Sequence, residues 1–220
     1  MDSGDNDEPG EPTEVPGQSG TGVSGLTFVY LSGRQIQMLA HPLRVRLLGH
    51  LRADGPATAT SLADVLETNT GATSYHLRQL AEAGLVVDEE RSGGGRQRWW
   101  RAVHDMSSWR RGYYEGDPDA TAAAEWMETQ QVNRFVELAR SWRHALPDES
   151  PEWQEAGEIS DYLLSLDAEQ LSALMTEVDD VIERHRAAAR AEPRHGARPV
   201  VLYAAALPQT PDQGGHRTTD

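Results

Sequence analysis

The residues best suited to specific chemistry lie on one face of a predicted helix, residues 71–83. Thr73, Leu77 and Leu80 recur at helical spacing, so their side of the helix is expected to pack against the protein. The opposite face is then open. Its hydroxyl, phenol and guanidinium groups can bond to the edges of bases, and a glycine permits close approach of the backbone. Five residues on this open face are available to contact double-stranded DNA, and we predict that they do so: Thr70, Gly71, Ser74, Tyr75 and Arg78.

A second group of cations follows this helix. Residues 85–91 and 96–102 are rich in β-forming residues and flank Ser92–Gly95, a pattern that predicts a β-hairpin with a flexible tip. Because guanidinium groups contact phosphates well, the hairpin, residues 85–102, is expected to lie along the DNA backbone. We assign this contact to Arg91, Arg96 and Arg98. A hairpin whose charges only face water is the alternative.

The elements that would position these groups form a short series. Residues 61–66 predict a short helix with Thr60 or Ser61 as its N-cap, and residues 68–71 have the composition of a tight turn in which Asn69 and Gly71 tolerate positive φ. The second helix then stops at Gly84. Two short helices joined in this way form a helix-turn-helix, whose second helix enters the major groove. An ordinary helical hairpin is the alternative, but the basic hairpin that follows favours a winged helix-turn-helix.

Four segments together carry a specific pattern, in this order along the chain: His41–Leu48, Ser61–Ala63, Ser74–Leu80 and Glu82–Val86. Over roughly residues 31–102 this pattern resembles the ArsR-like winged-helix repressors. The resemblance implies a homodimeric transcriptional regulator that binds an operator with pseudo-twofold symmetry. It also implies that bases are read from Thr70, Gly71, Ser74 and Tyr75. Many members of that family sense metals through cysteine thiolates, and this chain departs from them because it has no cysteine.

The charge of the chain is divided unevenly. The formal net charge is −15, yet residues 26–112 carry eleven Arg against eight acidic residues. Residues 1–25 carry six acidic residues and no basic one, and residues 113–220 carry nine Arg against twenty-one acidic residues. The predicted DNA-binding segment is therefore the cationic part, while the acidic remainder would repel DNA and limit non-specific binding.

The second half of the chain predicts a mostly helical module. Residues 121–146 have the pattern of a long amphipathic helix, and Asp167–Gln170 is a capping box that begins another. Residues 158–166 and 198–207 are strand candidates, although the first also fits a helix. Winged-helix repressors place two recognition helices about one DNA turn apart, roughly 34–36 Å, so a dimerising helix is expected. We predict that the long helix forms this seam through Val132, Phe135, Val136, Ala139 and Trp142.

These observations define four parts of the chain. They are a disordered acidic tail (1–25), a winged helix-turn-helix DNA-binding domain (26–112), a C-terminal module for dimerisation and candidate sensing (113–207), and a disordered tail (208–220). The predicted fold class is α+β: a winged helix-turn-helix followed by a mostly helical C-terminal module with a long helix and a small α/β unit.

Several classes of function lack support in the sequence. Without cysteine there are no disulfides and no thiolate metal sites, and the scattered histidines form no local metal motif, so we predict no metal and no cofactor. No phosphate-binding loop and no GxSxG nucleophile is present, so we predict that the protein is not an enzyme. No apolar run is long enough for a membrane helix, and a cytoplasmic location is expected. Two alternatives stay open: a winged-helix protein-interaction module, and a regulator that senses an unknown small-molecule effector through the C-terminal module.

Overall fold

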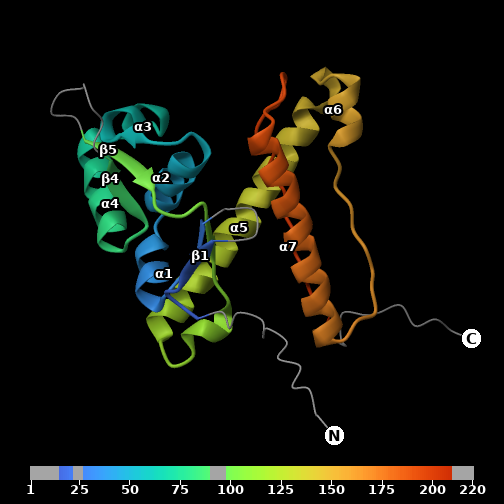
Figure 1. Ribbon diagram of the computed structural model, residues 1–220, viewed down its shortest axis with the longest axis horizontal. Helices are drawn as coiled ribbons and strands as arrows, with labels where there is room; N and C mark the ends of the chain where they lie inside the picture. Colours follow the sequence, from blue (N-terminus) through green and yellow to red (C-terminus); the bar gives the residue numbers. More distant parts are fainter. Residues whose placement is uncertain (1–14, 22–26, 90–97, 210–220) are drawn as a thin grey trace, which may run out of the picture. The chain divides into compact units, whose positions relative to one another are not determined.

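The computed structural model describes residues 15–21, 27–89 and 98–209. The chain divides into two compact units, residues 1–132 and 133–220. Figure 1 labels the helices of both units and strands β1, β4 and β5. The division falls inside a single long helix, α5 (Pro118–Ala145).

Three helices of the first unit form the helix-turn-helix and its support: α2 (Pro42–Ala53), α3 (Ala59–Val65) and α4 (Thr70–Glu82). Polar side chains at the N-caps fix where each begins, since they accept hydrogen bonds from otherwise unpaired N–H groups. His41 caps α2, Thr58 caps α3, and the Asn69 Oδ1 accepts the Ala72 N–H at 2.8 Å at the start of α4.

Two local predictions about this region are wrong. The N-cap of α3 is Thr58 rather than Thr60 or Ser61, because the capping box pairs Thr58 with Ser61, three residues later. The turn also lies earlier than expected. Its positive φ (52°) occurs at Glu67, whereas Asn69 is an extended N-cap and Gly71 is already helical. The predicted stop at Gly84 is confirmed, with a φ of 71° that favours glycine.

The wing hairpin is present in the described residues. Strands β4 (Val86–Glu89) and β5 (Trp99–Ala102) pair antiparallel, and β3 (Ala57–Thr58) joins the other edge of β5. The register places Asp88 opposite Trp100. Trp100 is buried and Trp99 is half-buried, so the two faces of β5 differ as a strand predicts.

A second small sheet joins distant parts of the chain. Its order is β1 (Ser19–Thr21), β2 (Thr27–Tyr30) and β6 (Met106–Ser108), with β2 and β6 parallel. Asp105 Oδ2 reinforces the junction by accepting the Thr27 N–H at 2.9 Å and the Thr27 hydroxyl at 3.0 Å. Strand β1 lies within the segment that the sequence predicts to be a disordered tail, where pairing with β2 orders it.

One core holds the first unit together. Helix α1 (Gly33–Leu39), the helix-turn-helix, the wing and the first turns of α5 all contribute to it. The 3₁₀ turn Arg111–Tyr114 closes this core, because the buried Tyr114 hydroxyl donates to the Leu31 carbonyl at 2.9 Å. Each buried aliphatic side chain contributes roughly 1.5–3 kcal/mol. The largest fully buried ones belong to Val29, Leu31, Ile36, Leu47, Leu77, Leu80 and Leu85.

The second unit is helical. It contains the rest of α5, a 3₁₀ turn (Leu146–Asp148), α6 (Pro151–Ala156) and α7 (Ala168–Ala191). The capping box of Asp167 and Gln170 is confirmed at the start of α7. The long amphipathic helix is also confirmed, three residues earlier at its start than expected.

The small α/β unit is the part of the prediction that needs correction. Residues 158–166 and 198–207 form no strand, and no backbone hydrogen bond joins either segment to another among the residues described. Their alternation of apolar residues satisfies only one requirement of a strand, since the backbone also needs a partner. The predicted fold class is otherwise confirmed: a winged helix-turn-helix followed by a mostly helical C-terminal region.

Candidate nucleic-acid interface

Helix α4 separates into a buried side and an open side. Thr73, Leu77 and Leu80 are completely inaccessible to solvent. The open side carries the five residues predicted to face DNA. Four of them are exposed and Ser74 is half-buried: Thr70, Gly71, Ser74, Tyr75 and Arg78. Tyr75 is the largest apolar group on this side, with 53% of its surface accessible. The helix thus presents hydroxyls, one phenol and one guanidinium on the same surface.

The Arg78 side chain folds back along its own helix. Its Nε donates to the Ser74 carbonyl at 3.0 Å. Its two terminal nitrogens have no hydrogen-bond partner among the residues described. This arrangement fixes the guanidinium near the middle of α4 and leaves two donor groups available for a ligand.

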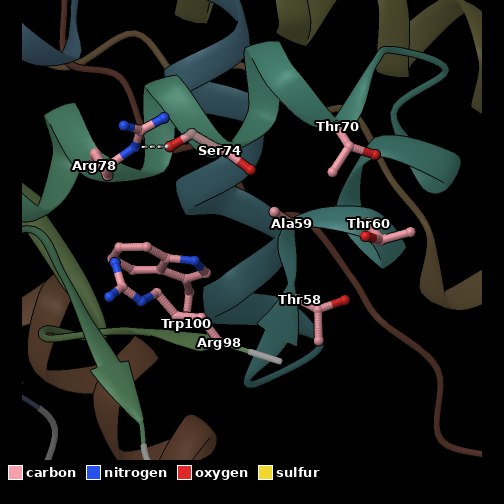
Figure 2. A pocket seen from close by; sticks show the side chains of 8 residues that line it. All are labelled: Thr58, Ala59, Thr60, Thr70, Ser74, Arg78, Arg98 and Trp100. Carbon is pink, nitrogen blue, oxygen red and sulfur yellow. Dashed lines mark hydrogen bonds between the residues drawn. The ribbon is translucent and has the colours of Figure 1, made fainter. Parts of the chain in front are cut away.

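A hollow of about 420 Å³ lies between α3, α4 and β5. Figure 2 shows the side chains around it, with Arg78 and Ser74 on α4, Thr60 on α3, and Trp100 on β5. Its complete lining is Thr58, Ala59, Thr60, Thr70, Ser74, Arg78, Arg98 and Trp100. Two guanidinium groups and several hydroxyls therefore surround one concave surface.

Arg98 enters this hollow from the wing, where two neighbours hold it. Its Nε forms an ion pair with the Asp88 Oδ2 at 2.7 Å. Its guanidinium carbon lies 5.5 Å from the centre of the Trp100 ring, within the range of a cation–π contact. Both partners of the ion pair are accessible, 59% for Arg98 and 44% for Asp88. Of the three wing cations predicted from the sequence, Arg98 is described here, whereas Arg91 and Arg96 lie outside the described residues.

A histidine pair packs beside Tyr75. The rings of His41 and His76 lie 4.3 Å apart, and Tyr75 meets His76 edge to face. Burial is the main cause that lowers the pKa of both histidines, and the nearby Arg44 lowers each further. His41 Nδ1 accepts the Leu43 N–H at 3.1 Å, which requires that nitrogen to be unprotonated. The lowered pKa values favour the uncharged form of both histidines, and their rings pack against each other and against Tyr75.

Arg52 of α2 is bonded within the first unit: its Nε donates to the His104 carbonyl at 3.0 Å and its Nη2 to the Ser107 hydroxyl at 2.7 Å. Sequence reasoning missed Thr60 and Trp100 as parts of the hollow, and Asp88 as the ion-pair partner of Arg98. The signal for Asp88 and Trp100 is their cross-strand pairing, which depends on a hairpin register that the glycine-rich tip leaves open.

The residues predicted for the dimer seam differ in exposure. Val132, Phe135 and Val136 are 62%, 39% and 36% accessible. Ala139 and Trp142 are half-buried. Trp142 packs on Gly157, where any larger residue would collide with its ring, and the Arg198 guanidinium lies 5.8 Å from its centre. Phe135 meets Tyr203 edge to face at 5.3 Å. Val132 and Val136 are therefore exposed, Phe135 is exposed but contacts Tyr203, and Trp142 already has neighbours.

The described residues contain neither a group of metal ligands nor a membrane-spanning helix. Within residues 15–21, 27–89 and 98–209, no three His, Asp or Glu side chains are grouped to hold a metal ion. In that same part of the chain, no helix combines the length and apolarity needed to cross a bilayer.

Comparison with known proteins identifies the core of the first unit. Residues 39–89 match the family model of a helix-turn-helix domain. No curated protein matches the chain. Among solved structures, a possible transcriptional regulator for arsenical resistance is 29% identical, covering 47% of this chain and 94% of its own, with a TM-score of 0.29.

Two further solved structures are more distant. A possible transcriptional regulatory protein from Mycobacterium bovis is 21% identical, covering 44% of this chain and 88% of its own, with a TM-score of 0.30. A MarR family regulator from Neisseria meningitidis is 14% identical, covering 70% and 78%, with a TM-score of 0.26. These TM-scores are too low for the similarities to inform on function.

The family match and the hairpin identify the fold. Residues 39–89 form a helix-turn-helix domain, which the β4–β5 hairpin completes as a winged helix-turn-helix, the architecture of DNA-binding transcriptional regulators.

Proposed function

We propose that the protein is a sequence-specific transcriptional regulator of the ArsR-like type, acting in the cytoplasm as a homodimeric repressor. The observation that carries the proposal is the open side of α4. It presents Thr70, Gly71, Ser74, Tyr75 and Arg78 next to the wing cation Arg98, in a part of the chain whose net charge is positive.

In the proposed complex, α4 lies in the major groove and the wing follows the backbone. The hydroxyls of Thr70 and Ser74 bond to base edges, and Gly71 lets the start of the helix approach closely. Tyr75 contributes a phenol and a flat apolar surface, with His41 and His76 supporting it. Arg98, together with Arg91 and Arg96, contacts phosphates, which sets the position of the helix without reading sequence.

We further propose that the exposed part of the α5 stripe forms the dimer seam. Val132, Phe135 and Val136 are apolar and accessible although they keep the spacing of one helix face. Contiguous exposed apolar groups of this kind mark interaction surfaces. A symmetric dimer would place two α4 helices about one DNA turn apart, roughly 34–36 Å, so that both read half-sites of one operator. Repression then results because the bound dimer excludes other proteins from the promoter.

Two alternative functions differ from this one in measurable ways. A winged helix that binds protein, with the acidic half of the chain contacting a basic partner, would show no enrichment of any DNA sequence. A regulator that responds to a small molecule would bind DNA, and the compound would act through the C-terminal module. A library of metabolites tested by thermal shift separates the latter from a regulator without an effector.

The decisive experiment is selection of fragments of the source genome by the purified full-length protein, followed by sequencing. We expect enrichment of a short inverted repeat. Log affinity for it should fall linearly with log salt, with a slope that reflects several phosphates.

Variants then assign the contacts. Ser74→Ala should lower affinity for the selected repeat by about 5- to 150-fold, equivalent to ~1–3 kcal/mol, and relax preference at one position. Arg111→Ala is the control, since Arg111 is an exposed arginine of the same unit that belongs to neither α4 nor the wing and is paired with Glu125. Failure to enrich any fragment at low salt would disprove the proposal.

A further inference from the structure

The hollow between α3, α4 and β5 brings together cations from two separate elements. Arg78 belongs to the middle of α4, and Arg98 precedes β5 in the wing (Figure 2). The remaining polar lining consists of hydroxyl groups from Thr58, Thr60, Thr70 and Ser74. No carboxylate is part of this lining. The Thr58 hydroxyl already donates to the Ser61 hydroxyl at 3.1 Å, and the other polar side chains around the hollow can donate a hydrogen bond to an anion.

Each of the two guanidinium groups is bonded through its own Nε and has two further nitrogens. Arg78 uses Nε on the Ser74 carbonyl. Arg98 uses Nε on Asp88 and rests against Trp100. Among the residues described, neither has a bond from its terminal nitrogens. Each therefore retains two nitrogens that can bind one anion from different sides.

We propose that this hollow is a phosphate-binding site shared by Arg78 and Arg98, and that Asp88 competes with the bound phosphate for Arg98. Where the phosphate is a phosphodiester of DNA, the inference rests on the proposed function. A free phosphate ion or a phosphate monoester has the same chemistry and is the second source.

The chemistry of the lining favours a phosphate over a planar carboxylate. Guanidinium groups bind phosphate oxygens through paired, charge-assisted hydrogen bonds. Here two such groups and several hydroxyls reach the same space from three elements, which suits a tetrahedral anion with oxygens on all sides. The volume of about 420 Å³ also accommodates the atoms attached to the phosphate, such as the sugars of a nucleic-acid backbone.

Asp88 acts against this anion. Exposed ion pairs contribute little net stability, and the Asp88–Arg98 pair is about half-exposed at both partners. A carboxylate at 2.7 Å from Arg98, in contrast, cancels much of the charge that an incoming phosphate would meet. Its position is fixed, because the β4–β5 register places Asp88 directly opposite Trp100. The free wing is therefore partly neutralised, and phosphate binding must overcome the existing pair.

The test measures the affinity of the full chain for a random 30-base-pair duplex by fluorescence anisotropy at several salt concentrations. Asp88→Asn keeps the shape and removes the charge, and it should raise affinity about three- to tenfold. Arg98→Ala should lower affinity about tenfold and reduce the salt slope by about one unit, the loss of one phosphate contact. The double variant should behave like Arg98→Ala, because Asp88 acts through Arg98.

Arg101→Ala is the matched control. Arg101 is an exposed arginine of the same strand, β5, but its guanidinium bonds to the Ala102 carbonyl and is not part of the hollow. Its loss should change affinity less than threefold. Thermal melts of each variant establish that all are folded. An equal gain from Asp88→Asn with and without Arg98, or no gain at all, would overturn the inference.

Competition by inorganic phosphate distinguishes the two sources. At matched ionic strength, phosphate that displaces the duplex better than chloride, and no longer does so in Arg98→Ala, would support a site that also accepts free phosphate. If phosphate and chloride are equivalent while the Asp88 and Arg98 effects persist, the site takes the DNA phosphodiester.

The proposed function and this site can also fail separately. If the wild-type chain binds the duplex and neither Arg78→Ala nor Arg98→Ala weakens it, the site is wrong although the function holds. If the wild type does not bind any duplex, the function is wrong. The phosphate site is then supported only if titrated inorganic phosphate raises the melting temperature of the wild type and not of Arg98→Ala, and it is overturned otherwise.

Discussion

Replacing Arg52 by Met should destabilise the winged helix without changing its affinity for DNA. The guanidinium joins α2 to β6 and the segment that leads into it, through a bond of 3.0 Å to the His104 carbonyl and one of 2.7 Å to the Ser107 hydroxyl within β6. Burial lowers the pKa of Arg52 to about 10, although the nearby Asp105 opposes this shift. The same arginine, judged by sequence alone, looks like an ordinary surface cation on a helix.

The magnitude follows from the two bonds and what opposes them. A hydrogen bond from a charged donor contributes roughly 1.5–3 kcal/mol, so two would give about 3–6 kcal/mol without any cost. Desolvation of the guanidinium offsets part of this, and methionine retains most of the apolar contacts. We therefore expect the free energy of unfolding to fall by about 2–3 kcal/mol. For a unit of this size the melting temperature should fall by roughly 8–15 °C.

Urea denaturation followed by circular dichroism measures this loss, with Arg46→Met as the control. Arg46 is exposed on the same helix and has one weak bond of 3.4 Å to the Leu66 carbonyl, so its replacement should cost less than about 0.5 kcal/mol. DNA affinity at a temperature well below the transition should be unchanged in both variants. An Arg52→Met variant as stable as the wild type, or one that loses affinity while fully folded, would refute this reasoning.

Three other predictions concern the same unit and α5. Asn69→Ala removes the N-cap of α4 and should cost about 1 kcal/mol in urea unfolding, whereas Asn69→Asp should cost much less. Lowering the pH below about 6.5 should reduce stability, because the pKa values of His41 and His76 are lower in the folded chain and the unfolded chain then binds more protons. Stability that rose on acidification through this window would contradict that assignment, and His76→Gln should reduce the pH dependence of the urea midpoint. Val136→Asp should shift the proposed dimer towards monomer in analytical ultracentrifugation and lower operator affinity at least tenfold, with Glu128→Gln, an exposed α5 residue, as the control.

The recognition helix is the element that the sequence predicts best. Its bounds, Thr70–Glu82, differ by one residue from those expected, because the apolar period at Thr73, Leu77 and Leu80 and the stop at Gly84 are local signals. The exposure of its other face follows from the same period. Local chemistry is less decisive at the N-cap of α3, where Thr58, Thr60 and Ser61 are all good caps and the first one forms the capping box with Ser61.

Features that depend on pairing between distant segments cannot be predicted from the local sequence in the same way. The strands of the β1–β2–β6 sheet have three or four residues each, and nothing local to Met106–Ser108 indicates that it will pair with Thr27–Tyr30. The reverse error occurs at residues 158–166, where alternation predicts a strand and no partner strand is present among the residues described. The Asp88–Arg98 ion pair is also a feature that depends on distant pairing, since it requires the register of β4 on β5.

The parallel pairing of β2 with β6 also constrains the order of events during synthesis. Thr27 and Asp105 are 78 residues apart, and Leu31 and Tyr114 are 83 apart, yet both pairs are needed to close one core. Contacts over such separations impose a large entropic cost before they contribute any stability, which slows folding. A nascent chain ending near residue 89 would contain the whole helix-turn-helix but leave its apolar faces uncovered. We expect a stable domain to form on the ribosome only after the first turns of α5 have left the exit tunnel.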